Sequence, residues 1–137
     1  MFTLHPQLAA DTVVVGRLPL SVVLLAKDAH YPWCILVPQR EDIREIHHLN
    51  ESDRSQLLEE SCALASVMEQ LFKPIKMNVA ALGNMVPQLH LHHVARFESD
   101  SAWPKPIWGC VDAIPYEKGE LQKRINALRE RLSLNIG

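Results

Sequence analysis

The sequence lacks the features that would assign a protein to a membrane, to export or to a nucleic acid. No apolar run approaches the roughly 20 residues that a helix needs to cross a bilayer. Residues 1–10 have neither the basic start nor the sustained apolar run of a secretory signal. The formal net charge is −2, whereas binding to a nucleic-acid polymer usually needs a basic surface. We therefore expect neither a membrane nor a nucleic-acid polymer as a partner.

Cysteine is also scarce. Cys34, Cys62 and Cys110 are an odd number of thiols at wide spacing, which makes a poor disulfide framework and contains no CxxC metal motif. Cys34 lies in an apolar run and Cys62 on the apolar side of a helical pattern, so both are predicted to be buried free thiols. Together with the missing signal, this pattern favours a reducing, cytoplasmic compartment.

The chain is predicted to form a single α+β domain over residues 1–137. Its length is enough to bury a proper core, and 47% hydrophobic and 22% charged residues are ordinary values for a globular protein. A long helix of about 20 residues is expected between a cap at Asn50 or Ser52 and Pro74, which cannot continue a helix. The predicted strands span residues 12–15, 21–26, 33–38, 77–82 and 88–96, and a second helix spans 117–134.

This order of elements favours one mainly antiparallel five-stranded sheet with the long helix across one face and a C-terminal helix. Residues 12–97 would form the core of the domain. A segment rich in proline and tryptophan, with Trp103 and Trp108, would then lead into the last helix, so that residues 98–137 follow the core.

The stretch QLHLHHV, residues 88–94, is the most informative part of the sequence. Side chains alternate between the two faces of a strand, so Gln88, His90 and His92 are predicted to share one face. Successive groups on that face would be about 6.6–6.8 Å apart. Such a row can contact several oxygens of one anion or supply two ligands to a metal ion. His93 points to the other face, where a packing or surface role is expected.

This stretch resembles the histidine strand of the histidine triad (HIT) family, His-φ-His-φ-His-φ-φ with φ apolar, except that Gln88 replaces the first histidine. Residues 83–87 resemble the Gly-Gln-(Ser/Thr)-Val-x lead-in of that family, and residues 35–40 resemble its Leu-Val-Ile-Pro-Lys strand end. The resemblance covers residues 22–96. It implies a HIT-like fold, a homodimer, and a nucleotide hydrolase or nucleotidyl transferase.

The resemblance also implies roles for single residues. The middle histidine of the motif falls on His90, which would attack the α-phosphate of a nucleotide conjugate and form a covalent nucleotidyl-histidine that water cleaves. His92 and Asn84 fall on phosphate-binding positions. The amides of Gln88 and Asn84 and a protonated His92 would then donate to the phosphate. The attacking imidazole needs one unprotonated nitrogen, so its other nitrogen should donate to an acceptor, which in the family is a backbone carbonyl. No metal and no cofactor is needed.

Two other interpretations remain open. Gln88 replaces one motif histidine, and the family often has a further histidine where this chain has Trp33, so the chain could be a nucleotide-binding module with little or no turnover. It could also be a metal-dependent enzyme that uses His90 and His92 as ligands. The third ligand would then come from elsewhere in the chain, from a residue such as His30, His47, His48, Asp28 or Glu98.

Overall fold

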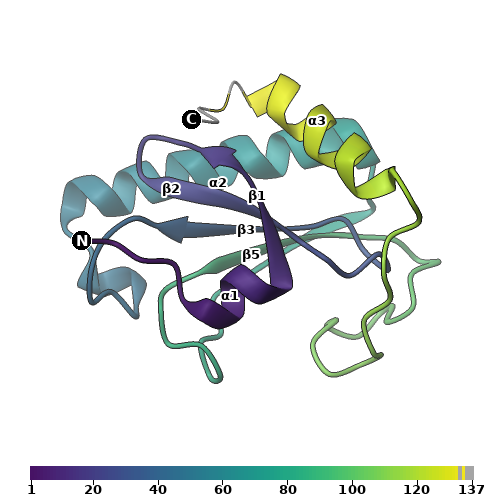
Figure 1. Ribbon diagram of the computed structural model, residues 1–137, viewed down its shortest axis with the longest axis horizontal. Coiled ribbons are helices and arrows are strands. Elements are labelled where there is room, and N and C mark those ends of the chain that lie inside the picture. The colour runs from purple at the N-terminus through teal and green to yellow at the C-terminus, as the bar shows by residue number, and fades with distance from the viewer. Residues whose placement is uncertain (133, 135–137) are drawn as a thin grey trace.

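The computed structural model describes residues 1–132 and 134, and it confirms the α+β class with one five-stranded sheet (Figure 1). The strand order is β1-β2-β3-β5-β4, and every neighbouring pair is antiparallel. The strands are β1 (Thr12–Arg17), β2 (Ser21–Ala26), β3 (Trp33–Pro38), β4 (Lys76–Ala80) and β5 (Leu91–Arg96). The helices are α1 (Pro6–Asp11), the 3-10 turn η1 (Ile46–His48), α2 (Glu51–Phe72) and α3 (Glu120–Leu132).

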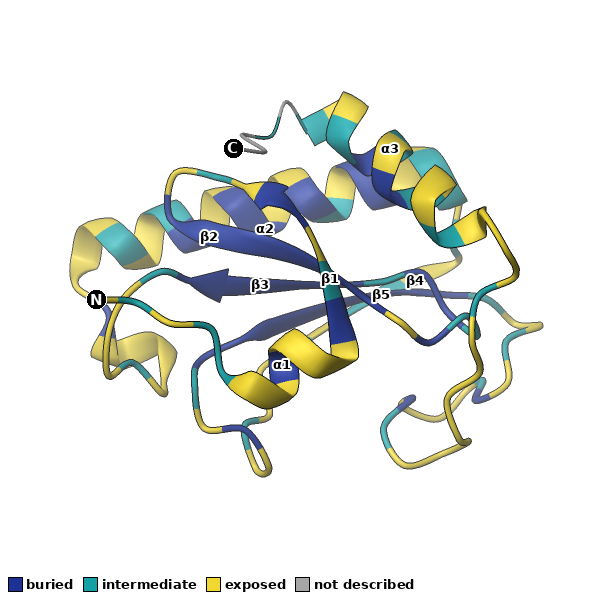
Figure 2. Ribbon diagram, in the orientation of Figure 1, coloured by how far each residue is buried: buried dark blue, intermediate teal, exposed yellow. Residues whose placement is uncertain are grey.

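Helices cover both faces of the sheet. In Figure 1, α2 lies behind the sheet and α1 lies in front of it. Val23 and Leu25 of β2 pack in the cluster that includes residues of α2 and α3, whereas Val22 and Leu24 pack in the cluster that includes Leu8 of α1. Figure 2 shows that β2 and β3 are almost entirely buried. This explains why their sequences are apolar at every position rather than at alternate positions.

The long helix α2 begins and ends as its sequence predicts. The side chain of Asn50 accepts a hydrogen bond from the backbone N–H of Asp53, and Lys73 ends the helix in a left-handed conformation just before Pro74. Within the described residues, no helix has the length and apolar character that crossing a membrane would need.

The buried face of α2 differs from the predicted one. Glu60 and Ser61 are buried, whereas Cys62 is exposed, so the prediction of a buried Cys62 is wrong and that of a buried Cys34 is confirmed. Glu60 accepts a hydrogen bond from the backbone N–H of Leu20 at 2.7 Å, which lets a carboxylate occupy a core position. Cys62 follows Ser61 and is therefore rotated by about 100° around the helix axis, away from the sheet.

The two strands near the histidines are shorter than predicted, and α1 was not predicted at all. The structure has β4 at 76–80 and β5 at 91–96, where we expected 77–82 and 88–96. Gly83 turns the chain with a φ of +79°, and the backbone N–H of Leu89 then donates to the carbonyl of Ile43 at 2.9 Å rather than to a neighbouring strand. Residues 81–90 therefore form a longer connection than the expected tight turn over 83–87, and His90 lies just before β5.

Candidate active site

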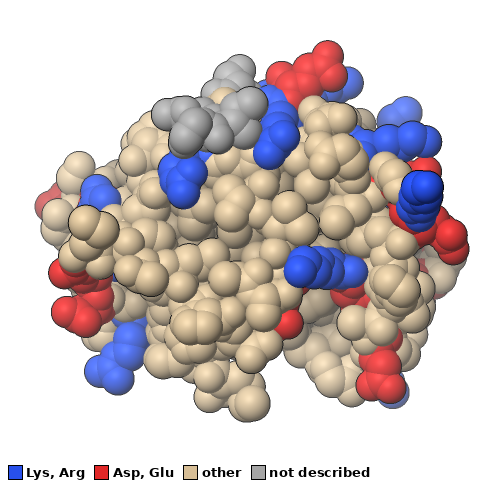
Figure 3. Space-filling view, in the orientation of Figure 1, with Lys and Arg blue, Asp and Glu red and all other residues tan. Residues whose placement is uncertain are grey.

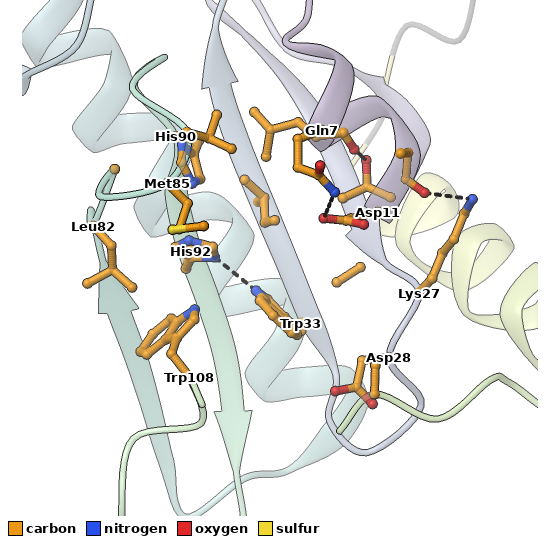
Figure 4. A pocket seen from close by; sticks show the side chains of 18 of the residues that line it. Gln7, Asp11, Lys27, Asp28, Trp33, Leu82, Met85, His90, His92 and Trp108 are labelled. Carbon is orange, nitrogen blue, oxygen red and sulfur yellow. Dashed lines mark hydrogen bonds between the residues drawn. The ribbon is translucent and has the colours of Figure 1, made fainter. Parts of the chain in front are cut away.

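A cavity of about 690 Å³ lies on the face of the sheet that carries α1 (Figure 4). Its walls come from α1, from the ends of β1, β2 and β3, and from the connection between β4 and β5. His90 and His92 line it together with Asn84. The alternation expected for the histidine motif therefore brings these two imidazoles to one cavity, although His90 itself precedes the strand.

His90 is held by the backbone of its own motif. Its Nδ1 lies 2.7 Å from the carbonyl oxygen of Gln88. A carbonyl oxygen only accepts hydrogen bonds, so Nδ1 carries the proton and Nε2 has the free lone pair. The side chain is buried to 7% exposure and still reaches the cavity wall. This is the tautomer that a nucleophilic imidazole requires.

His92 is held in the opposite tautomer by a tryptophan. The indole Nε1–H of Trp33 donates to Nδ1 of His92 at 3.0 Å, as Figure 4 shows by a dashed line. An indole N–H cannot accept, so Nδ1 is unprotonated and the proton of His92 is on Nε2. Burial, together with the nearby His90 and His93, lowers the pKa of His92 from 6.5 to about 3. In this structure His92 is therefore a neutral donor, which differs from the protonated His92 expected from the sequence beside a phosphate.

Aromatic rings surround His92. Its ring centroid lies 4.9 Å from that of His90, 5.7 Å from that of Trp33 and 5.1 Å from that of Trp108. Trp108 belongs to the proline- and tryptophan-rich segment, so this segment reaches the cavity. Trp103 does not line it and packs instead against the guanidinium of Arg96, 5.5 Å from the ring centroid.

Arg96 organises the segment that carries Trp108, a role that no sequence motif indicated. Arg96 is only 2% exposed and donates to both carboxylate oxygens of Asp100, to the side chain of Asn78 and to the carbonyl of Lys105. Burial by itself would raise the pKa of Asp100, but the hydrogen bonds from Arg96 and from two backbone N–H groups outweigh it and lower this pKa to about 2. A buried ion pair thus holds the start of the segment against β5 and β4.

The two predicted amide ligands lie in different places. Asn84 is exposed and lines the cavity directly after the turn at Gly83. The side chain of Gln88 is absent from the cavity wall. Its Oε1 accepts from the backbone N–H of His5 at 2.9 Å, and its Nε2 donates to the carbonyl of Thr3 at 2.9 Å. Gln88 therefore holds the N-terminal segment with its side chain while its carbonyl holds His90.

The proposed third metal ligands do not join His90 and His92. His30 bonds to Asp28 at 2.8 Å, and His47 and His48 lie in η1. Within residues 1–132 and 134, no three His, Cys, Asp or Glu side chains form a group that could hold a metal ion. The metal-dependent alternative thus has no third ligand among the described residues.

Charged side chains are few around the cavity. Asp11, Lys27 and Asp28 are the charged residues among the described ones that line it, and Nζ of Lys27 donates to the carbonyl of Ala10 at 3.0 Å. Figure 3 shows the same face of the molecule as largely uncharged, with most charged groups towards its periphery. An anion in this cavity would therefore be bound mainly by neutral donors rather than by a cluster of cations.

Known proteins resemble this chain in sequence and in fold. The family model of the HIT domain matches residues 7–99. The chain is 45% identical to a histidine triad protein from Bradyrhizobium japonicum, with a TM-score of 0.94 over 96% of this chain and 98% of that one. It is 49% identical to a histidine triad protein from Marinobacter aquaeolei, with a TM-score of 0.94 over 97% of each chain. No protein with a curated description matches the chain.

Proposed function

Because the chain belongs to the histidine triad (HIT) family, we propose that it is a nucleotide hydrolase or nucleotidyl transferase that acts at the α-phosphate of a nucleotide conjugate. The observation that carries this proposal is the hydrogen bond that fixes the tautomer of His90. Its Nδ1–H is directed to the carbonyl of Gln88, which leaves the lone pair of Nε2 for attack. Activity on nucleotides is typical of this family, although some of its members are not catalytic.

In the proposed reaction, Nε2 of His90 forms a bond to the α-phosphorus while the bond to the leaving group breaks. The imidazole then carries a positive charge, which the hydrogen bond from Nδ1 to the carbonyl of Gln88 stabilises. Water cleaves the nucleotidyl-histidine in a second step. Splitting one difficult displacement into two is the usual gain from a covalent intermediate.

The phosphate oxygens would accept from Nε2–H of His92 and from the amide of Asn84, which both line the cavity. The side-chain amide of Gln88 would first have to leave Thr3 and His5, so its contribution to phosphate binding is the weakest of the predicted set. Positioned neutral donors suit phosphoryl transfer, in which the protein mainly orients groups and stabilises charge.

A homodimer and a cytoplasmic location complete the proposal. Strand β4 lies at the end of the sheet, and the outer edge of β4 has no strand partner among the described residues. A sheet edge of this kind can pair with a second chain. Size-exclusion chromatography with light scattering would test the dimer directly.

Intact mass spectrometry tests the covalent step. The protein is mixed briefly with adenylyl and guanylyl conjugates and quenched under mildly alkaline conditions, because phosphoramidates are labile in acid. We expect one added nucleotidyl group, which is absent in His90→Ala and retained in the control His47→Ala, an exposed histidine of η1. An adduct that persists in His90→Ala would refute the proposed nucleophile. Nucleotide binding without any adduct or turnover would favour the binding module instead.

A further inference from the structure

The hydrogen bond between Trp33 and His92 has a chemical consequence for the leaving group. Trp33 is the first residue of β3 and pairs with Val94 of β5, so the sheet itself sets its distance from His92. The indole Nε1–H points at Nδ1 of His92 from 3.0 Å. Because the indole has no acceptor, protonating Nδ1 would place two N–H groups against each other.

A histidine can give away its Nε2 proton at neutral pH only if Nδ1 also carries one, since losing the proton from neutral imidazole would create an imidazolate anion. Trp33 excludes a proton at Nδ1 of His92. His92 can therefore donate a hydrogen bond to an oxygen, but it has no proton to transfer. The burial of His92 and its low pKa, about 3, act in the same direction.

The other groups close to His92 do not change this situation. His90 presents its unprotonated Nε2, and that nitrogen becomes bonded to phosphorus in the proposed reaction. Trp108 contacts His92 through its ring, with the two ring planes at 67°. The amino group of Lys27, which is the cationic side chain among the described residues that line the cavity, bonds to the carbonyl of Ala10 on α1.

We propose that Trp33 is a positioning residue that makes His92 a neutral hydrogen-bond donor, and that the site therefore cleaves nucleotide conjugates whose leaving group departs as a stable anion. A mixed anhydride between a nucleotide and a carboxylic acid is a substrate class of this kind, because its leaving group departs as a carboxylate. This preference rests on the nucleotidyl-transfer function proposed above.

The electron and proton balance explains the preference. With a mixed anhydride, the lone pair of His90 Nε2 forms the N–P bond, and the pair of the breaking P–O bond leaves on the carboxylate. No proton is needed. With an alkylamine conjugate, the nitrogen must take up a proton before the P–N bond breaks, and His92 cannot supply it.

Nitrogen NMR tests the role of Trp33 without any substrate. In long-range ¹H–¹⁵N spectra of the full chain, protonated and unprotonated ring nitrogens resonate in separate regions. We expect His92, assigned by its loss in His92→Gln, to show an unprotonated Nδ1 and a protonated Nε2 from pH 5 to 8. Trp33→Phe should lose this fixed pattern, whereas the matched control Trp108→Phe should keep it, because Trp108 gives a ring contact and no hydrogen bond to His92. A protonated Nδ1 in the unchanged protein would overturn the assignment.

Kinetics test the leaving-group preference. For each protein, kcat/KM for an acyl adenylate is divided by kcat/KM for an alkylamine phosphoramidate of the same nucleoside. This ratio is compared between the unchanged protein and Trp33→Phe, so that the intrinsic reactivity of the two conjugates cancels. General-acid help contributes about 10²–10⁴-fold. Trp33→Phe removes the donor at Nδ1 of His92 and part of the ring that buries it. We therefore expect this variant to let His92 take a second proton and to lower the ratio at least about tenfold. If Trp33→Phe only damaged the structure of the site, both rates would fall equally. An unchanged ratio would overturn the preference.

The two kinds of failure are distinguishable. If neither conjugate is turned over, the proposed function is contradicted, and so is the leaving-group preference that depends on it. The NMR pattern of the unchanged protein still confirms or refutes the role of Trp33. Equal kcat/KM for both conjugates, with Nδ1 of His92 unprotonated, refutes the leaving-group preference alone. The unchanged protein supplies this evidence even if Trp33→Phe fails to fold.

Discussion

His92 and His93 are neighbours on β5, yet they belong to two different regions of the molecule. His93 points into the core, where its Nδ1 lies 3.0 Å from the carbonyl of Leu91 and its Nε2 lies 2.7 Å from the hydroxyl of Ser61 on α2. His92 points to the cavity, where Trp33 bonds to its Nδ1. Within the described residues, Nε2 of His92 has no hydrogen-bond partner.

Burial affects both histidines in the same way. It lowers the pKa of His93 from 6.5 to about 4 and that of His92 to about 3. A low pKa therefore does not distinguish a core histidine from one in a site. The distinction is whether the protein already occupies both nitrogens or leaves one of them for a ligand.

The largest expected effect is a loss of activity when His90, on the cavity side of the sheet, is replaced. His90→Ala should lower kcat by at least about 10³-fold, because no other group replaces the nucleophile. The free energy of unfolding should fall by less than about 2 kcal/mol, since the side chain borders a cavity. Steady-state turnover and urea unfolding measure the two quantities. Full activity in His90→Ala would show that the proposed mechanism is wrong.

Replacing His93, on the core side of the sheet, should change stability instead of activity. His93→Ala should lower the free energy of unfolding by about 2–4 kcal/mol, because it leaves a cavity between β5 and α2 and removes the partner of Ser61. Turnover per folded molecule, measured well below the unfolding midpoint, should stay within about threefold of the original. Ser61→Ala, which removes one hydrogen bond, is the milder control. A loss of turnover without a loss of stability would place His93 in the site.

Acid should destabilise the protein through both histidines. Their pKa is lower in the folded state than the ordinary 6.5, so the unfolded state binds more protons between about pH 6.5 and the folded values of about 3 and 4. Stability is then fully present above pH 6.5 and falls as the pH falls through this window. Each imidazole contributes up to about 1.4 kcal/mol per pH unit. Unfolding curves from pH 4 to 7 should show a shallower slope in His92→Asn, and an unchanged slope would contradict the pKa of His92.

The smallest effect concerns the N-terminal segment, which borders the cavity. Gln88→Ala removes the two hydrogen bonds to His5 and Thr3 while keeping the carbonyl that holds His90. We expect global stability to change by about 1 kcal/mol or less, because these bonds are partly exposed. The amide of His5 should exchange with deuterium clearly faster, whereas amides of β2 should not change. Unchanged exchange at His5 would show that Gln88 does not hold the segment.

Much of the fold followed from local patterns. The apolar runs of β2 and β3, the capped helix α2 and the sheet with a helix across one face were predicted and confirmed. The sequence also placed His92 and His93 on opposite faces. Helix α1 was missed because it is one short turn-like element, six residues long, whose stability depends on packing against the sheet through Leu8.

The site was predictable only in part. The motif indicated His90, His92 and Asn84, and all three line one cavity. The motif did not indicate that the side chain of Gln88 bonds to Thr3 and His5. The role of Arg96 was equally hidden, because its partners lie on β4 and in an irregular segment.

The sequence by itself determined which side chains share a face, since alternation along a strand is a local property of the extended backbone. Only the tertiary structure decided the protonation of His92. The carbonyl of Gln88, two residues away, sets the tautomer of His90, but Trp33, 59 positions away, sets that of His92. The physical reason is that a ring nitrogen takes its proton state from the donor or acceptor beside it, and folding chooses that neighbour.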